Sequence, residues 1–151
     1  MTERIRRVLI VEDGTEYHDA FRRLSPAGAD GSVEWLRAPD AAAAKRLLAE
    51  GEVDAIFLDV VFDRTPPENL VGAGDRRTLA ARQGFHIAAD LAAEIPPGVP
   101  VLLAYDFTSD PARLAALRET IPALEGVEEG SSASRLVDRL LGPSARSSRR
   151  R

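Results

Sequence analysis

Three acidic residues stand directly after two short apolar runs. Glu12 and Asp13 follow residues 7–11, and Asp59 follows residues 55–58. Such runs are typical of buried strands, and the carboxyl ends of parallel strands gather at one edge of a sheet. Three carboxylates at one edge repel each other unless a cation lies between them, and Mg²⁺ prefers oxygen ligands. The sequence therefore predicts a magnesium site formed by Glu12, Asp13 and Asp59, at which a carboxylate could attack a phosphoryl group.

A local role for the first two acids is the alternative. Glu12 and Asp13 would then begin a loop and place negative charge at the N-terminus of the next helix, where it is favourable. The third acid, Asp59, at a second strand end favours the pocket. The only lysine of the chain is Lys45. No lysine can therefore complete the pocket from a later strand.

The overall composition fits one globular domain. The chain has 151 residues, of which 44% are hydrophobic, and this length is sufficient to bury one core. A net charge of −4 argues against a general nucleic-acid binder. There is no cysteine, so disulfides and thiolate metal sites are excluded. No apolar leader and no run of membrane-spanning length is present, and we expect a cytoplasmic protein.

Apolar periodicity and turn residues divide the chain into five strand–helix units. Strict alternation of strands and helices predicts a doubly wound, five-stranded parallel sheet with helices on both faces. Two segments fall outside this pattern. One is an insertion at 62–82, and loops of that length are usually functional or disordered. The other is a basic tail at 143–151, which we expect to be disordered. The predicted domain is 1–142. The predicted strands are 7–11, 32–37, 53–61, 99–105 and 124–128, and the predicted helices are 14–24, 41–50, 83–95, 109–120 and 131–141.

The order and spacing of three segments resemble those of the response-regulator receiver family. The segments are residues 8–13, 56–59 and 99–103. The resemblance covers 7–141 and implies a flavodoxin-like receiver fold. It also implies that Asp59 accepts a phosphoryl group from a histidine kinase. The acids Glu12 and Asp13 would bind Mg²⁺ together with Asp59, and Val61 would contribute its backbone carbonyl to the same ion.

Three positions differ from what the resemblance implies. Tyr105 stands where the family places a threonine or serine after the fourth strand, and Thr108 or Ser109 would have to supply that hydroxyl instead. Glu129 stands where the family places a lysine, which reverses the charge beside a phosphoryl group; a register shifted by one residue places Gly130 there, and the cation is still missing. Gly126 stands where the family usually has an aromatic residue of the switch. We therefore treat Tyr105 and Glu129 as candidate switch positions. In the alternative, Tyr105 is a core residue that fills the volume left by the missing aromatic side chain at Gly126.

The insertion at 62–82 is the fourth difference. If Gly84 is the glycine that the family has about eight residues after the acceptor, it stands 25 residues after Asp59. Roughly 17 residues are then extra. The insertion carries Arg64 and other charged residues beside the predicted pocket. It could cap the pocket, supply an arginine to it, bind a partner, or remain a solvated disordered loop.

Three functions stay open from the sequence. The first is a single-domain receiver-like signalling protein of a phosphorelay, which acts by protein–protein contact and is not an enzyme, with a histidine kinase or another signalling protein as partner and a homodimer as a candidate assembly. We expect no specific nucleic acid or membrane partner. The second is a phosphorylation-independent pseudo-receiver that serves as a docking module. The third is a magnesium-dependent enzyme of the topoisomerase–primase type, because residues 11–14 and the pair Asp59 and Asp63 resemble its Glu and Asp-x-Asp motifs, although two residues too far apart.

Overall fold

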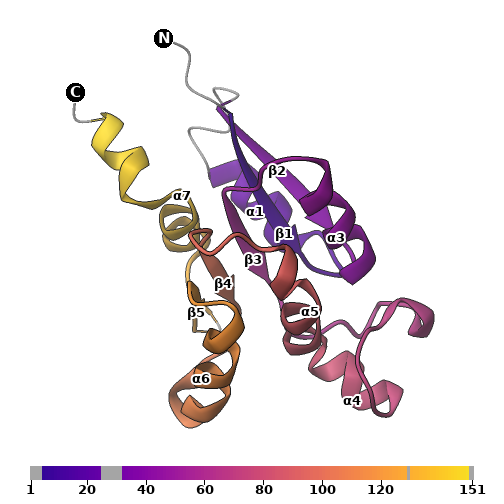
Figure 1. Ribbon diagram of the computed structural model, residues 1–151. Helices are drawn as coiled ribbons and strands as arrows, with labels where there is room; N and C mark the ends of the chain where they lie inside the picture. The colour runs from indigo at the N-terminus through magenta and orange to yellow at the C-terminus, as the bar shows by residue number, and fades with distance from the viewer. Residues whose placement is uncertain (1–4, 25–31, 129, 150–151) are drawn as a thin grey trace.

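Five parallel strands form one sheet in the order β2-β1-β3-β4-β5. The computed structural model describes residues 5–24, 32–128 and 130–149, and it confirms the doubly wound α/β fold expected from the sequence. Its strands run nearly side by side through the middle of the molecule (Figure 1). The strand bounds are β1 Arg6–Val11, β2 Val33–Ala38, β3 Ala55–Leu58, β4 Val101–Leu103 and β5 Leu124–Gly126.

Helices cover both faces of this sheet. On one face α1 packs against α7, and on the other α3 packs against α5, which in turn contacts α6. Helix α4 lies apart from the sheet, beyond the end of α5 (Figure 1). In the part of the chain that the structure describes, no helix is both long and apolar enough to cross a membrane. The helix bounds are α1 Glu16–Leu24, α3 Ala41–Glu50, α4 Arg76–Ala81, α5 Gln83–Leu91, α6 Pro111–Thr120 and α7 Ala133–Arg149, with short 3-10 turns η1 Pro67–Asn69, η2 Ala92–Glu94 and η3 Phe107–Ser109.

Each face of the sheet has its own hydrophobic core because successive side chains of a strand point to opposite faces. In β1, Val8 and Ile10 join the core beneath α1 and α7. Leu9 and Val11 of the same strand join the core beneath α3 and α5. All four side chains are fully buried. A strand buried on both faces explains why the first apolar run has no polar interruption.

Element boundaries differ modestly from those expected. β3 and β4 keep only the middle of the runs 53–61 and 99–105, since only those residues pair with neighbouring strands. The predicted helix over 83–95 ends at Leu91 and continues as the 3-10 turn η2. The last helix was expected to end at Leu141. The first helical part of α7 does end there, because Gly142 has a non-helical φ of 74° and ψ of 173°, and a second helical part continues to Arg149. The disorder of the tail stays a prediction.

Candidate functional site

The three acidic residues of the sequence prediction lie at the same edge of the sheet. Val11 and Leu58 pair at the ends of β1 and β3, so Glu12, Asp13 and Asp59 leave neighbouring strands together. The backbone N–H of Asp59 donates to the carbonyl of Val11 at 2.9 Å, which extends the pairing one residue into the loops. This convergence follows from strand ends in a parallel sheet.

Glu12 is directed at the start of α1. Its side chain is 1% exposed. The two carboxylate oxygens accept the backbone N–H groups of Tyr17 at 3.0 Å and His18 at 2.8 Å. Burial raises the pKa of Glu12, and these two hydrogen bonds act in the opposite direction. The capping role considered for this residue is therefore observed, because its carboxylate satisfies two N–H groups of the first helical turn that have no partner inside the helix.

Asp13 is engaged by the insertion. Its Oδ2 accepts the backbone N–H of Arg64 at 2.8 Å, and Nε of Arg64 lies 4.0 Å from Oδ1. The Asp13 side chain is 6% exposed. From the other side, the guanidinium of Arg37 donates to the carbonyl of Asp13 at 3.0 Å and to that of Gly14. Arginines from β2 and from the insertion thus hold this acidic loop.

Asp59 opens onto a pocket of about 410 Å³. Its Oδ1 accepts the backbone N–H of Val60 at 2.9 Å. Burial raises the pKa of Asp59 to about 6, and the negative charges of Glu12 and Asp13 add to this rise. Desolvation and like charge both disfavour an ionised carboxylate. Aromatic and polar side chains surround the carboxyl group in this pocket, among them Tyr17, Arg82, Phe85, Tyr105 and Ser109.

The acidic residues do not fit a magnesium ion as they lie. Three of the four carboxylate oxygens of Glu12 and Asp13 already accept hydrogen bonds from backbone N–H groups. Throughout the described ranges, no three His, Asp or Glu side chains form a group that could hold a metal ion. Val61, the predicted carbonyl ligand, has its side chain 48% exposed beside this pocket. Magnesium binding stays a prediction for experiment.

Comparisons with known proteins agree on the architecture. The receiver domain of NtrX from Brucella abortus matches with a TM-score of 0.57 and 16% identity, over 86% of this chain and 91% of that one. A CheY-like receiver domain protein from Methanospirillum hungatei JF-1 matches with a TM-score of 0.61 and 11% identity, over 97% and 99%. This chain has the receiver fold. No protein-family profile and no curated protein matches it.

One further match carries ligands. A response regulator from Burkholderia pseudomallei, described with a phosphorylated aspartic acid, a calcium ion and citrate, matches with a TM-score of 0.59 and 12% identity. It covers 95% of this chain and 71% of that one. At such identities the likeness establishes the receiver fold, and the chemistry of the pocket has to be argued from the residues of this chain.

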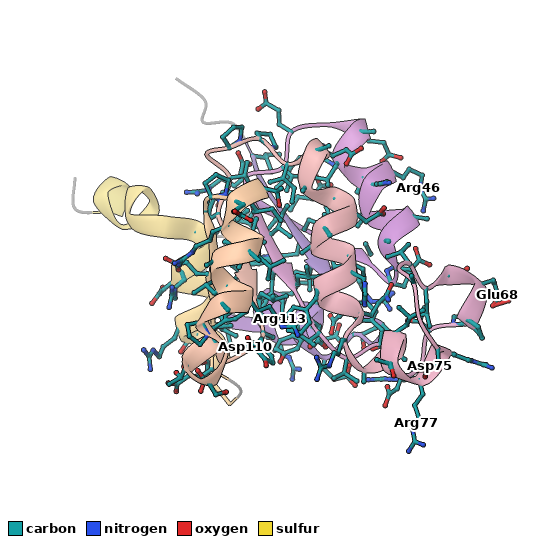
Figure 2. All side chains as sticks on the ribbon, turned by 60° about the horizontal axis from the view of Figure 1, so that its bottom comes forward. Arg46, Glu68, Asp75, Arg77, Asp110 and Arg113 are labelled. Atoms are coloured by element: carbon teal, nitrogen blue, oxygen red, sulfur yellow. The ribbon has the colours of Figure 1, made fainter. Side chains whose placement is uncertain are left out.

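Tyr105 packs into an aromatic cluster at the end of β4. Its ring meets those of Phe85 and Phe107 edge to face, at centroid distances of 4.8 and 4.9 Å. The pKa of Asp110 is lowered first by Arg113 and further by a hydrogen bond from Tyr105. Figure 2 shows Asp110 and Arg113 together at the start of α6, with Arg113 Nε 2.8 Å from Oδ2 of Asp110. The phenol is therefore engaged with α6.

The hydroxyl groups that follow differ in their surroundings. Thr108 donates its hydroxyl to Asp106 at 2.6 Å. Ser109 lines the pocket of Asp59. Of the two hydroxyl candidates named from the sequence, Ser109 is the one that lines this pocket.

Phe107 fills the space beside Gly126, where receivers were expected to carry an aromatic residue. A Cβ on Gly126 would lie 2.3 Å from the Phe107 ring and 2.5 Å from the carbonyl oxygen of Tyr105. The vacant volume is thus occupied by a ring from the β4–α6 connection, and Tyr105 lies next to it. Nothing in the sequence pattern pointed to Phe107. Glu129, the other candidate switch position, lies outside the described residues.

The described insertion is anchored at several points. Phe62 is fully buried, and its N–H donates to the carbonyl of Ala80 at 2.8 Å. Gln83, which is 1% exposed, accepts the N–H of Val71 at 2.9 Å and donates to its carbonyl at 3.0 Å. The side-chain amide of Gln83 thus pairs with both backbone groups of Val71, as a neighbouring strand would, and joins the insertion to the start of α5. A solvated disordered loop does not describe this segment.

Gly84 must be a glycine because α5 passes close to the loop after β3. A Cβ at this position would lie 2.2 Å from the carbonyl oxygen of Asp59. The Gly84 N–H donates to the carbonyl of Val60 at 2.9 Å. The structure thus gives a physical reason for the glycine that the sequence placed here, and the insertion before it adds length without moving α5 away from the pocket.

Proposed function

We propose that this protein is a receiver-type signalling module that acts by binding other proteins, independently of phosphorylation at Asp59. The observation that carries the proposal is the state of the acidic pocket, where the carboxylates of Glu12 and Asp13 already accept hydrogen bonds from the protein itself. The receiver fold supports a signalling role by analogy with the proteins that share it.

Charge argues against an ordinary phosphoryl pocket. Burial and the charges of Glu12 and Asp13 already raise the pKa of Asp59 to about 6, and a phosphoryl group on Asp59 would add further negative charge beside those two carboxylates. Such transfer needs nearby cations that neutralise the phosphoryl oxygens. The one lysine of the chain, Lys45, lies on α3 and pairs with Asp90 at 3.2 Å. Arg82 is the cation that lines the Asp59 pocket.

Phosphorelay signalling through Asp59 is the second candidate. Its support is the position of Asp59 after β3, in an open pocket that also contains Arg82 and Ser109. A structurally similar response regulator is described with a phosphorylated aspartic acid. In this form a histidine kinase would be the partner and Mg²⁺ the cofactor, and Glu12 and Asp13 would have to exchange protein donors for the ion.

A nucleic-acid enzyme receives no support from the arrangement. That hypothesis needs Glu12, Asp59 and Asp63 to act on a shared metal ion. Asp63 is exposed on the insertion. No group of three acidic side chains suited to a metal is found in the described ranges.

Intact mass separates the two signalling forms. The wild type and Asp59→Ala are incubated with Mg²⁺ and a small-molecule phosphodonor, and each mass is recorded. We expect neither protein to gain a phosphoryl group. A single adduct on the wild type that is absent from Asp59→Ala would overturn the proposal and establish Asp59 as a phospho-acceptor.

A further inference from the structure

We propose that Arg64 is a built-in counter-cation, through which the insertion gives the acidic edge the positive charge that a divalent metal ion would otherwise supply. The inference rests on the proposed function, because it explains how the acidic edge is neutralised without a metal. It assigns a positioning role to one residue of a segment that has no place in the five strand–helix units.

The contacts of Arg64 place it over the acidic loop. Its backbone N–H donates to Asp13 at 2.8 Å, and its guanidinium lies 3.1 Å from Oε2 of Glu16. The side-chain Nε is 4.0 Å from Asp13. One residue therefore contacts a carboxylate at the end of β1 and a second at the start of α1. The pKa of Arg64 is raised, first by the hydrogen bond with Glu16 and then by the charges of Glu16 and Asp13.

Gly14 provides the space for this guanidinium. A Cβ on Gly14 would lie 2.8 and 2.9 Å from the two terminal nitrogens of Arg64. It would also lie 2.1 Å from Oε1 of Glu16. A side chain at this position would require the ends of the Arg64 and Glu16 side chains to shift, and both are largely exposed.

The insertion fixes Arg64 through its neighbours. Phe62 is fully buried two residues earlier, and its carbonyl accepts the N–H of Thr65 at 3.4 Å. Farther along, Asn69 donates to Asp40 at 3.2 Å. Because the chain is held at Phe62 and at Asn69, on either side of Arg64, the distance that Arg64 can move from Asp13 is limited. Forming the contact between Arg64 and Asp13 therefore costs less conformational entropy than it would in an unanchored loop.

The contact with Asp13 is the important one. Arg64 is 61% exposed and Glu16 is 66% exposed, so their ion pair is screened by water and contributes little by itself. Asp13 is 6% exposed, and a buried carboxylate needs hydrogen bonds or positive charge to stay ionised. A metal ion that took Asp13 as a ligand would have to displace the hydrogen bond from the Arg64 backbone N–H. It would also be repelled by the guanidinium, whose Nε lies 4.0 Å from the same carboxylate. The insertion and the ion therefore compete for the same carboxylate.

Magnesium titration of matched variants tests this competition. The wild type, Arg64→Gln and Arg77→Gln are unfolded thermally in EDTA and in increasing MgCl₂, with ionic strength held constant by NaCl. Arg77 is the control because it lies on the same insertion and points away from the body of the protein (Figure 2). Both variants at position 64 keep the backbone donor to Asp13, so Arg64→Gln removes only the guanidinium charge, and Arg64→Lys, which keeps a positive charge, is the conservative variant.

We expect the wild type, Arg77→Gln and Arg64→Lys to show no saturable response to Mg²⁺. We expect Arg64→Gln to gain one, with the unfolding midpoint rising by about 3–6 °C at ten times the dissociation constant. Adding Asp13→Asn to Arg64→Gln should remove the gain. A saturable Mg²⁺ response of the wild type, or a gain in Arg77→Gln equal to that in Arg64→Gln, would overturn the inference.

The two proposals fail in different ways. A phosphoryl adduct on Asp59 in the wild type contradicts the proposed function, whatever the magnesium titration gives. No adduct, combined with an Arg64→Gln protein that stays unresponsive to Mg²⁺, contradicts the role of Arg64 alone. If Arg64→Gln fails to fold, the wild type and Arg64→Lys still decide, since a saturable Mg²⁺ response in either contradicts the inference.

Discussion

Replacing Asp59 by asparagine should stabilise the protein at neutral pH. The folded protein raises the pKa of Asp59 from its ordinary 3.8 to about 6, mainly by burial. An acid with a raised folded pKa binds its proton more tightly in the folded state, so wild-type stability falls as pH rises from about 4 to about 6. Asparagine carries no charge to desolvate, and its carbonyl oxygen can still accept the N–H of Val60.

The size of the effect follows from the shift. About two pKa units at 1.36 kcal/mol each give roughly 3 kcal/mol as an upper figure. Because Asp59 is partly exposed, water screens it, and about 1–2 kcal/mol is the reasonable expectation at pH 7.5. Urea denaturation of the wild type and Asp59→Asn in EDTA, at pH 4 and pH 7.5, measures the difference directly.

The gain should shrink toward zero at pH 4, where the wild-type carboxyl group is protonated. Asp63→Asn is the matched control, since Asp63 is an exposed carboxylate four residues later, and it should change stability by less than about 0.5 kcal/mol. An Asp59→Asn protein that is less stable than the wild type at pH 7.5, or equally stabilised at both pH values, would refute the reasoning.

Two further predictions concern the base of the insertion. Gly84→Ala should lower the free energy of unfolding by about 1–3 kcal/mol in urea denaturation, because its methyl group would lie 2.2 Å from the carbonyl oxygen of Asp59. The control is Gly98→Ala, which has no atom within 4 Å of its Cβ and should cost less than about 0.5 kcal/mol. Equal costs would contradict the close approach at Gly84. Gln83→Leu should lower the free energy of unfolding by about 1–3 kcal/mol, because it loses two hydrogen bonds to Val71. Limited proteolysis should then cleave within 62–82 faster than in the wild type. An unchanged cleavage rate would show that the Gln83–Val71 hydrogen bonds do not hold the insertion in place.

The best-predicted elements are those in which local signals and burial agree. β1 follows from an uninterrupted apolar run that is buried on both faces. α3 matches its predicted range of 41–50 because Asp40 caps its first turn, accepting the N–H of Ala43 at 2.9 Å, and Gly51 follows its last residue. β3 and β4 are shorter than predicted, because their lengths depend on pairing with strands that are distant in the sequence. The six-residue α4 was not predicted, since its start depends on an Asp75 cap inside a segment that reads as polar loop.

The part of the site that could be predicted from the sequence is the part whose position is set by the ends of strands. The positions of Glu12, Asp13 and Asp59 at one edge follow from two apolar runs in a parallel sheet. The partners of Glu12 did not follow, because either role of an acid after a strand, capping or metal binding, fits the same sequence. The buried role of Gln83 has no local signature, since its partner lies in the insertion twelve residues earlier.

A crystal structure determined with Mn²⁺, located by its anomalous scattering, tests most directly the claim that the protein neutralises its own acidic edge. Manganese resembles magnesium in its preference for oxygen ligands. We predict no ion between the three acidic residues and an Arg64 N–H that remains hydrogen-bonded to Asp13. A manganese ion coordinated by Asp13 and Asp59, with Arg64 displaced, would contradict the account.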